Sequence, residues 1–293
     1  MMKHRAFKTR LEQYRQASAI HGGILNACMA ALAVRLSRVR IPSKRLRLRL
    51  YRTIYGKKYT ALNESELERP LWAYPSFNAL FTRGVRAELR PIGSAADQLL
   101  CPCDGTVQEV GAIREDKILT VKGIEYSVGS LLAGMDPRPY HDGSYAILFL
   151  SPSDCHRIFS PQDGTIDEII HVPGHRLLVH PPFQRPEYPV FSLNERVILH
   201  LSTPLGKCVL VLVAGWGVGN ITFPRGRLFR PRLRRTSRLS FDPPLPVKKG
   251  DWIATFELGS TAILIGEPAD PVTPLVRADE KVHYGQPIFS IQR

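Results

Sequence analysis

Acidic residues are missing from a long stretch near the N-terminus of this 293-residue sequence. Positions 13–63 contain no Asp or Glu but 11 Lys or Arg, and positions 225–238 contain seven Arg and no acid. The formal net charge of +14 is therefore concentrated in two segments. Localised basic charge predicts an anionic partner, either an anionic membrane or a nucleic acid. The sequence contains no recognisable nucleic-acid-binding module, so we favour the membrane and expect no nucleic acid.

Cysteine is scarce, and its five positions are scattered through the chain. An odd number without regular spacing excludes the disulfide framework of a small secreted domain and favours a reducing compartment. Cys101 and Cys103 lie close together, but no second pair completes the four ligands of a zinc site, so we expect no metal. His171 and His175 have the spacing of a helical metal site, but the intervening Pro-Gly predicts a turn instead.

Long hydrophobic runs are also absent. The longest one near the N-terminus, 27–34, is far short of the ~20 residues that cross a bilayer, and no signal-peptide cleavage site follows it. Six residues instead recur at helical spacing and form one apolar stripe. They are Ile20, Ile24, Ala27, Cys28, Ala31 and Leu32. The basic segment Lys44–Arg52 follows the stripe. This combination is typical of a helix in a membrane interface, but a helix packed on its own domain explains it equally well.

Short β-rich runs dominate the sequence from about residue 98 onward. They alternate with turn residues and lack intervening helical patterns, which predicts a sandwich or barrel. The expected strands lie at 118–123, 144–152, 164–172, 195–203, 207–215, 252–259 and 261–267. The Arg- and Pro-rich segment Phe223–Pro246 is expected to be an exposed loop. We therefore expect an α+β fold, with basic amphipathic helices in residues 1–65 and a β-rich catalytic domain in residues 66–293.

One sequence pattern occurs twice. Cys101–Val110 (CPCDGTVQEV) and Ser160–Ile169 (SPQDGTIDEI) each place an Asp-Gly turn ahead of a strand. The repeat predicts a duplicated β unit. Because the pattern is a turn signal, it does not by itself distinguish Asp104 from Asp163.

A glycine and two hydroxyl side chains interrupt an otherwise apolar strand near the C-terminus, FELGSTAIL. Glycine inside a strand costs entropy and packs nothing, so Gly259 marks either a bulge or a functional position. The hydroxyl of Ser260 becomes a nucleophile only if a base takes its proton. His156 follows a predicted buried strand and is a candidate base. Asp104, or else the nearby Asp154, is a candidate for the carboxylate that orients the imidazole.

Several segments, in this order, resemble the phosphatidylserine decarboxylases, which are pyruvoyl-dependent enzymes that mature by self-cleavage. The resemblance covers most of the chain from about Phe77 onward. Its segments are FNALFTRGVRAELRPIG (77–93), CDGTV (103–107), KILTVKGIEYSVGSLLAG (117–134), SPSDCHRIFSP (151–161) and LGST (258–261). The fourth is similar to the family's Asp-Tyr-His-Arg-x-His-x-Pro motif, and the last to its cleavage motif.

The resemblance implies that the bond between Gly259 and Ser260 is cut. Asp104 and His156 would activate Ser260 Oγ to attack the Gly259 carbonyl, which leaves a β chain of residues 1–259 and an α chain of residues 260–293. The α chain would begin with a pyruvoyl group, the covalent cofactor, made from Ser260. Its ketone would accept the amine of phosphatidylserine and hold the electrons left when CO₂ departs. Protonation would then yield phosphatidylethanolamine.

Two positions depart from the family motif. Phe159 stands where many relatives have a second histidine, and Cys155 stands where tyrosine is usual. His156 would then be the motif's only imidazole and would serve as the base for Ser260. Two alternatives stay open. One is a decarboxylase of another serine-headed lipid, and the other is a non-catalytic basic β protein that binds membranes or nucleic acid.

An anionic lipid substrate would give the basic N-terminal region a role, because Lys and Arg are attracted to anionic membrane surfaces. We therefore expect peripheral association with the cytoplasmic face of the cell membrane. The expected partners are an anionic phospholipid membrane, phosphatidylserine as substrate, and the α and β chains of one precursor. A homo-oligomer is compatible with the sequence.

Overall fold

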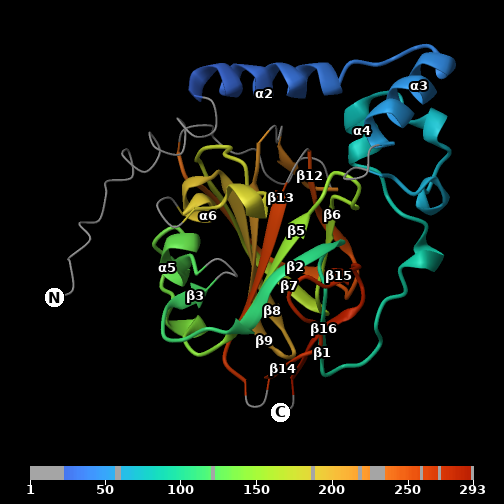
Figure 1. Ribbon diagram of the computed structural model, residues 1–293. Helices are drawn as coiled ribbons and strands as arrows, with labels where there is room; N and C mark the ends of the chain where they lie inside the picture. The colour runs from blue at the N-terminus through green and yellow to red at the C-terminus, as the bar shows by residue number, and fades with distance from the viewer. Residues whose placement is uncertain are drawn as a thin grey trace.

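The computed structural model describes residues 23–56, 61–119, 123–185, 189–216, 220–224, 235–257, 260–269 and 272–291. Its α-helices are α2 (Gly23–Ser37), α3 (Lys44–Tyr55), α4 (Phe77–Phe81), α5 (Val128–Leu131) and α6 (Val190–Leu193). Single 3₁₀ turns are η1 (Glu64–Glu66), η2 (Leu71–Ala73), η3 (Ala87–Leu89), η4 (Arg138–Tyr140) and η5 (Pro181–Phe183). The longer helices belong to the N-terminal part of the chain, and strands dominate the rest (Figure 1).

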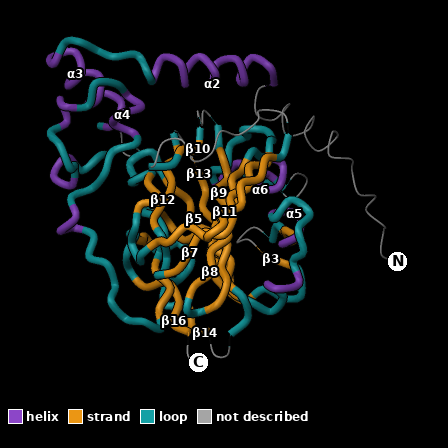
Figure 2. The backbone as a smooth tube through the Cα atoms, turned by 180° about the vertical axis from the view of Figure 1, so that it is seen from behind, coloured by secondary structure: helices purple, strands orange, loops and turns teal. Residues whose placement is uncertain are grey.

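An eight-stranded antiparallel sheet forms the centre of the protein (Figures 1 and 2). Its order is β11 (Ser237–Val247), β7 (Gly164–Val172), β8 (Arg196–Thr203), β9 (Gly206–Ala214), β13 (Ser260–Gly266), β5 (Ser144–Leu150), β2 (Gly105–Ala112) and β15 (Lys281–Val282). One three-stranded sheet contains β1 (Gln98–Leu100), β16 (Pro287–Ile291) and β14 (Val272–Pro274). Another contains β10 (Ile221–Thr222), β12 (Trp252–Phe256) and β6 (Arg157–Phe159), and a hairpin pairs β3 (Lys117–Leu119) with β4 (Glu125–Ser127).

The central strands are buried on both faces. Along β13, Ala262 and Leu264 face the core that includes β12 and β16, whereas Ile263 and Ile265 face the core under α5 and α6. Successive strand residues point to opposite faces, so a strand covered on both sides must be apolar at every position. This explains why the sequence shows continuous apolar runs rather than strict alternation.

The α+β fold with a β-rich core is confirmed. The seven predicted runs correspond to β3, β5, β7, β8, β9, β12 and β13. The duplicated unit is also visible in the register of the sheet. In β2 the pairing with β5 shifts between Val107 and Glu109, and in β7 the pairing with β8 shifts between Ile166 and Glu168. The two bulges occupy equivalent positions of the repeated sequence, so the two copies share the same irregularity in their backbone pairing.

The prediction of an exposed loop over Phe223–Pro246 is wrong for its second half. Residues 237–247 form β11, which pairs with β7 through an irregularity between Ser240 and Leu245. Proline lacks an N–H for a central ladder, but an edge strand with a bulge tolerates it, and β11 is an edge of the main sheet. Positions 225–234 lie outside the described residues.

Helix α2 lies across one end of the main sheet (Figures 1 and 2). Its exposed apolar side chains follow helical spacing at Leu25, Met29, Leu32 and Leu36. We call these four residues the α2 ridge. The predicted stripe shares only Leu32 with this ridge, and Ile20 lies outside the described residues. Within the described part of the chain, no helix is long and apolar enough to span a membrane.

Helix α3 connects the N-terminal region to the rest of the protein. Ser43 caps its N-terminus by accepting a hydrogen bond from the Leu46 N–H, and Tyr51 and Tyr55 are buried. The two tyrosines pack in one apolar cluster with residues between Leu67 and Leu80. The predicted boundary at residue 65 therefore lies inside a packed cluster, and the division into two domains stays a prediction.

Candidate active site

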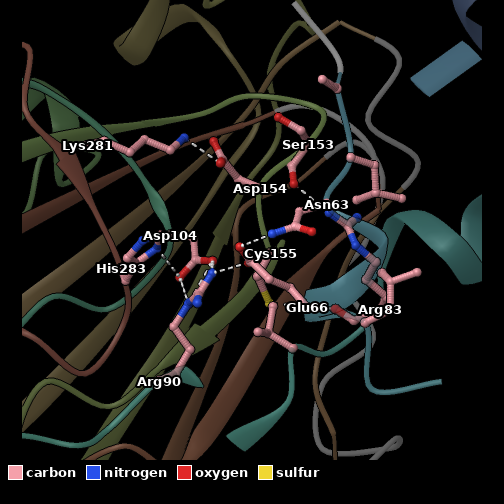
Figure 3. A pocket seen from close by; sticks show the side chains of 14 residues that line it. Asn63, Glu66, Arg83, Arg90, Asp104, Ser153, Asp154, Cys155, Lys281 and His283 are labelled. Carbon is pink, nitrogen blue, oxygen red and sulfur yellow. Dashed lines mark hydrogen bonds and ion pairs between the residues drawn. The ribbon is translucent and has the colours of Figure 1, made fainter. Parts of the chain in front are cut away.

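A polar cavity of about 170 Å³ lies next to the end of β5 (Figure 3). Its walls come from segments that are distant in sequence, at residues 61–67, 83–90, 104, 153–155 and 281–283. The side chains that line it include carboxylates, guanidinium groups, a lysine and an imidazole. Asp104, one of the predicted site residues, lies in this wall.

Asp104 is almost completely buried, with 2% of its surface exposed. Arg90 donates from Nη2 to Oδ2 at 2.8 Å and from Nε to Oδ1 at 3.1 Å, and the Tyr284 N–H donates to Oδ1 at 2.9 Å. Burial opposes ionisation of this carboxyl. The contacts with His283 and Arg90 outweigh burial, and the pKa of Asp104 falls below its ordinary value. Asp104 is therefore a buried carboxylate, whereas Asp163 of the repeated unit is exposed.

Gly105 explains how Asp104 reaches this position. A Cβ at residue 105 would lie 2.7 Å from the Phe149 carbonyl oxygen of the neighbouring strand β5. Gly164 of the repeated unit is equivalent, since a Cβ there would lie 2.1 Å from the Ser202 oxygen. In both units glycine permits the close approach of two strands at the start of the pairing.

His156 is completely buried beside β12. Its backbone carbonyl accepts a hydrogen bond from the Phe256 N–H at 2.9 Å, and its ring centroid lies 3.9 Å from that of Phe81. Nδ1 lies 3.0 Å from the Asp154 carbonyl oxygen, which assigns the proton to Nδ1. Nε2 has no hydrogen-bond partner among the described residues. Burial lowers the pKa of His156 from 6.5 to about 3, so Nε2 is an unprotonated base.

Neither predicted carboxylate orients this imidazole through its side chain. Asp104 is held by Arg90, and the Asp154 carboxylate accepts from Ser151 Oγ and pairs with Lys281. The orienting group is a main-chain carbonyl instead. Sequence patterns report side-chain types, so they do not reveal a carbonyl that is placed by the turn after β5.

Ser260 is the first residue of β13, between β5 and β9. It is paired with Leu150 on one side and with Ala214 on the other. Gly259 lies outside the described residues. Because neighbouring strands are roughly 5 Å apart, the backbones of Ser260 on β13 and of Gly105 on β2 are separated by roughly 10 Å. Phe256, the hydrogen-bond partner of His156, precedes Ser260 by four residues. The three predicted residues therefore come from neighbouring parts of one end of the fold.

A buried hydroxyl follows Ser260 directly in β13. This hydroxyl, of Thr261, is completely buried and, like His156 Nε2, lacks a hydrogen-bond partner among the described residues. Unpaired buried polar atoms are costly, and they are expected where a reaction or a bound group uses them. No cluster of three or more His, Cys, Asp or Glu able to hold a metal occurs in the described ranges.

Several residues that line the cavity were not predicted as site residues, among them Arg90, Lys281, His283 and Arg83. Arg90 holds Asp104, Lys281 pairs with Asp154, His283 contacts Asp104, and Arg83 donates to the Ser153 carbonyl at 2.5 Å. A buried carboxylate requires a nearby cation, so a Lys or Arg was the sequence signal that could have identified its partner. The sequence contains 40 Lys and Arg, so this signal does not select Arg90 or Lys281.

The two departures from the motif are both buried. Burial raises the pKa of the Cys155 thiol to about 12, so it is an inert thiol. Phe159 stacks on Tyr284 with ring centroids 3.7 Å apart and an interplanar angle of 14°. Each side chain thus has a packing role in the wall beside Asp104.

Comparison with known proteins identifies the family of this chain. The family model for phosphatidylserine decarboxylase matches residues 77–290. The phosphatidylserine decarboxylase proenzyme of Nitrosococcus oceani is 34% identical over 268 residues, which is 89% of this chain and 86% of that protein. The proenzymes of Halorhodospira halophila (37% identity, 77% of each chain) and Acidovorax ebreus (39% identity, 69% of this chain and 72% of that protein) are also similar. The chain belongs to the phosphatidylserine decarboxylase family.

Proposed function

We propose that this chain is a proenzyme that cuts itself between Gly259 and Ser260 and then decarboxylates phosphatidylserine to phosphatidylethanolamine. Family membership supports the reaction. The observation that carries the assignment of residues is the buried, unpaired Nε2 of His156 beside the strand that leads into Ser260. An unprotonated base at that place is what a serine nucleophile requires.

Maturation begins when His156 Nε2 takes the proton of Ser260 Oγ. The oxygen attacks the Gly259 carbonyl carbon, the C–N bond breaks, and the freed amine of residue 260 takes up a proton. The resulting ester is eliminated across Cα and Cβ of residue 260, which releases the Gly259 carboxylate. Hydrolysis then releases ammonia and leaves the pyruvoyl group. His156 is suited to the first step because its Nδ1–H is anchored on the Asp154 carbonyl.

The pyruvoyl ketone supplies the electron sink for loss of CO₂. The residues of this chain do the rest. The Asp104 carboxylate is fixed by Arg90 and Tyr284, so it stays ionised although it is almost completely buried. Held by these two residues, Asp104 is a fixed negative charge that can stabilise a protonated group in the cavity.

The membrane is the second part of the proposal. The α2 ridge exposes Leu25 by 75%, Met29 by 64%, Leu32 by 55% and Leu36 by 58%. Exposed apolar residues at this spacing, followed by the basic helix α3, support a helix that lies in the interface of an anionic membrane. The substrate is itself a membrane lipid, so we place the protein peripherally on the cytoplasmic face of the cell membrane. Residues 1–65 then form the membrane-association region.

Intact mass tests self-processing. The α chain has 34 of the 293 residues of a 32.9 kDa protein, and it is expected at roughly 3.8 kDa with a blocked N-terminus. Ser260→Ala and His156→Gln are each expected to remain one chain. A single uncleaved species in fresh wild-type protein contradicts self-processing. Normal cleavage of Ser260→Ala points to a protease, and normal cleavage of His156→Gln places the base elsewhere.

A further inference from the structure

The imidazole nearest to Asp104 belongs to His283, not to His156. His283 Nδ1 lies 3.7 Å from Asp104 Oδ1, at ion-pair distance (Figure 3). The His283 side chain is 46% exposed, whereas that of Asp104 is 3% exposed. Among the described residues that line the cavity, His283 is the one histidine. The expected pairing of a carboxylate with an imidazole therefore exists, with a partner from the C-terminal part of the chain.

The position of His283 is fixed by its neighbours. The Tyr284 N–H donates to the same Oδ1 atom of Asp104 at 2.9 Å, and the ring of Tyr284 stacks on Phe159. The backbone N–H of His283 donates to Gln286 Oε1 at 2.9 Å. Phe159, which stands where many relatives have a histidine, thus packs against the residue that follows His283. Phe159 and Asp104 are thus connected through Tyr284, whose ring stacks on Phe159 and whose backbone N–H binds the carboxylate.

The charges around His283 are also defined. Arg90 contacts Asp104 from the buried side, and it forms a second ion pair with Glu66 at 2.8 Å. Lys281, two residues before His283, is paired with Asp154 and not with Asp104. Asp104 consequently has Arg90 on its buried side and the half-exposed imidazole of His283 toward solvent.

Decarboxylation requires a proton donor that water can recharge. Loss of CO₂ breaks a C–C bond and leaves the electron pair on the α-carbon of the lipid headgroup, and one proton must arrive there in every turnover. His156 is a poor donor because it is completely buried and its pKa of about 3 leaves it without a proton near neutral pH. His283 has the solvent access that His156 lacks, and it lies at ion-pair distance from the buried carboxylate of Asp104.

We propose that His283, supported by Asp104, is the acid that delivers this proton. The proposal rests on the proposed function and divides the labour between two imidazoles. His156 accepts the proton of Ser260 during maturation. His283 gives a proton to the α-carbon of the headgroup after CO₂ has left, and takes a new one from water.

The test uses the full-length chain and measures cleavage and decarboxylation separately. We expect His283→Gln to be cut into two chains at the wild-type rate. Its kcat for phosphatidylserine in mixed vesicles is expected to fall tenfold or more, in the range typical for loss of a general acid. His141→Gln is the matched control, because His141 precedes the opposite end of β5, and it is expected to keep the wild-type kcat.

A readout independent of the pyruvoyl group comes from the uncleaved Ser260→Ala precursor. The effects of His283→Gln and Asp104→Asn on urea unfolding are expected to be non-additive, because the two side chains interact directly. A wild-type kcat in His283→Gln overturns the proposal, as does a block in cleavage, because His283 would then act before decarboxylation. Failure of the wild-type chain to decarboxylate the lipid would instead refute the proposed function.

Discussion

Arg90 contacts both carboxylate oxygens of Asp104, and the side chains are only 5% and 3% exposed. A buried ion pair of this kind is costly to break on one side, because the remaining charge loses its partner. The two residues are 14 positions apart, and between them the chain passes through β1. The contact therefore joins the segment that follows the N-terminal helices to the main sheet.

Arg90→Met is expected to lower the free energy of unfolding by about 3 kcal/mol, the usual cost of removing one partner of a buried ion pair. Urea denaturation of the Ser260→Ala precursor measures this without the complication of chain cleavage. Arg86→Met is the control, since Arg86 lies in the same segment but is 48% exposed. Its expected cost is below about 1 kcal/mol. Equal losses of unfolding free energy in the two variants would show that the buried Arg90–Asp104 pair stabilises the fold no more than the contacts of an exposed arginine do.

The cleavage rate is expected to be constant between pH 5 and 8. Burial lowers the pKa of His156 to about 3, so the imidazole stays neutral and able to accept a proton throughout this range. An exposed histidine would instead lose its function below about pH 6.5. Quench-flow or gel analysis of a slow-maturing precursor measures the rate. A rise of tenfold between pH 5.5 and 7.5 would show that the base titrates as an exposed histidine does.

The same depressed pKa makes the fold less stable in acid. The imidazole of His156 is neutral in the native state, but in the unfolded chain it binds a proton below about pH 6.5. Protonation therefore favours the unfolded state as pH falls from 6.5 toward 3, by up to about 1.4 kcal/mol per pH unit. Urea unfolding of the Ser260→Ala precursor at pH 7.5, 6.0 and 5.0 measures the slope. His156→Gln in that background is expected to reduce the slope. An unchanged slope would show that His156 is not the cause of the pH dependence of stability.

Gly105→Ala is expected to destabilise the fold by about 2 kcal/mol, because its Cβ would lie 2.7 Å from a backbone oxygen that cannot rotate away. The nearest neighbour of a Cβ at Gly129 is 3.5 Å away, at ordinary contact distance. Gly129 lies in α5, where alanine is favoured over glycine. Gly129→Ala is therefore expected to be neutral or slightly stabilising in the same thermal or urea assay. A tolerated Gly105→Ala would mean that β2 and β5 separate easily.

Leu25→Asp combined with Leu32→Asp on the α2 ridge is expected to reduce flotation with anionic vesicles at least tenfold, because buried charge opposes insertion. Leu275→Asp is the matched control. Leu275 is 43% exposed and follows β14 at the opposite end of the molecule from α2 (Figure 1). Loss of flotation in the control alone would move the membrane-binding surface to that end. Salt is expected to weaken binding of the wild-type protein, since the basic flank contributes.

The sequence predicted the central strands well because each is a short run of β-branched and aliphatic residues. Local composition gave the wrong prediction for β11. Its Arg- and Pro-rich sequence indicated a loop, but the segment pairs with β7 and forms a strand. In the candidate site, Asp104, His156 and Ser260 could be selected from motifs. Their partners could not, because Lys281 lies 127 positions from Asp154, and Tyr284 lies 180 positions from Asp104. Such contacts are decided by the packing of the whole sheet.

Arg38, immediately after α2, is paired with Glu257. Glu257 precedes the proposed scissile bond by two residues. Once that bond is cut, Glu257 becomes the third residue from a new, negatively charged chain end at Gly259. The Arg38–Glu257 ion pair then connects the C-terminal part of the β chain to the end of α2, the helix proposed to lie on the membrane.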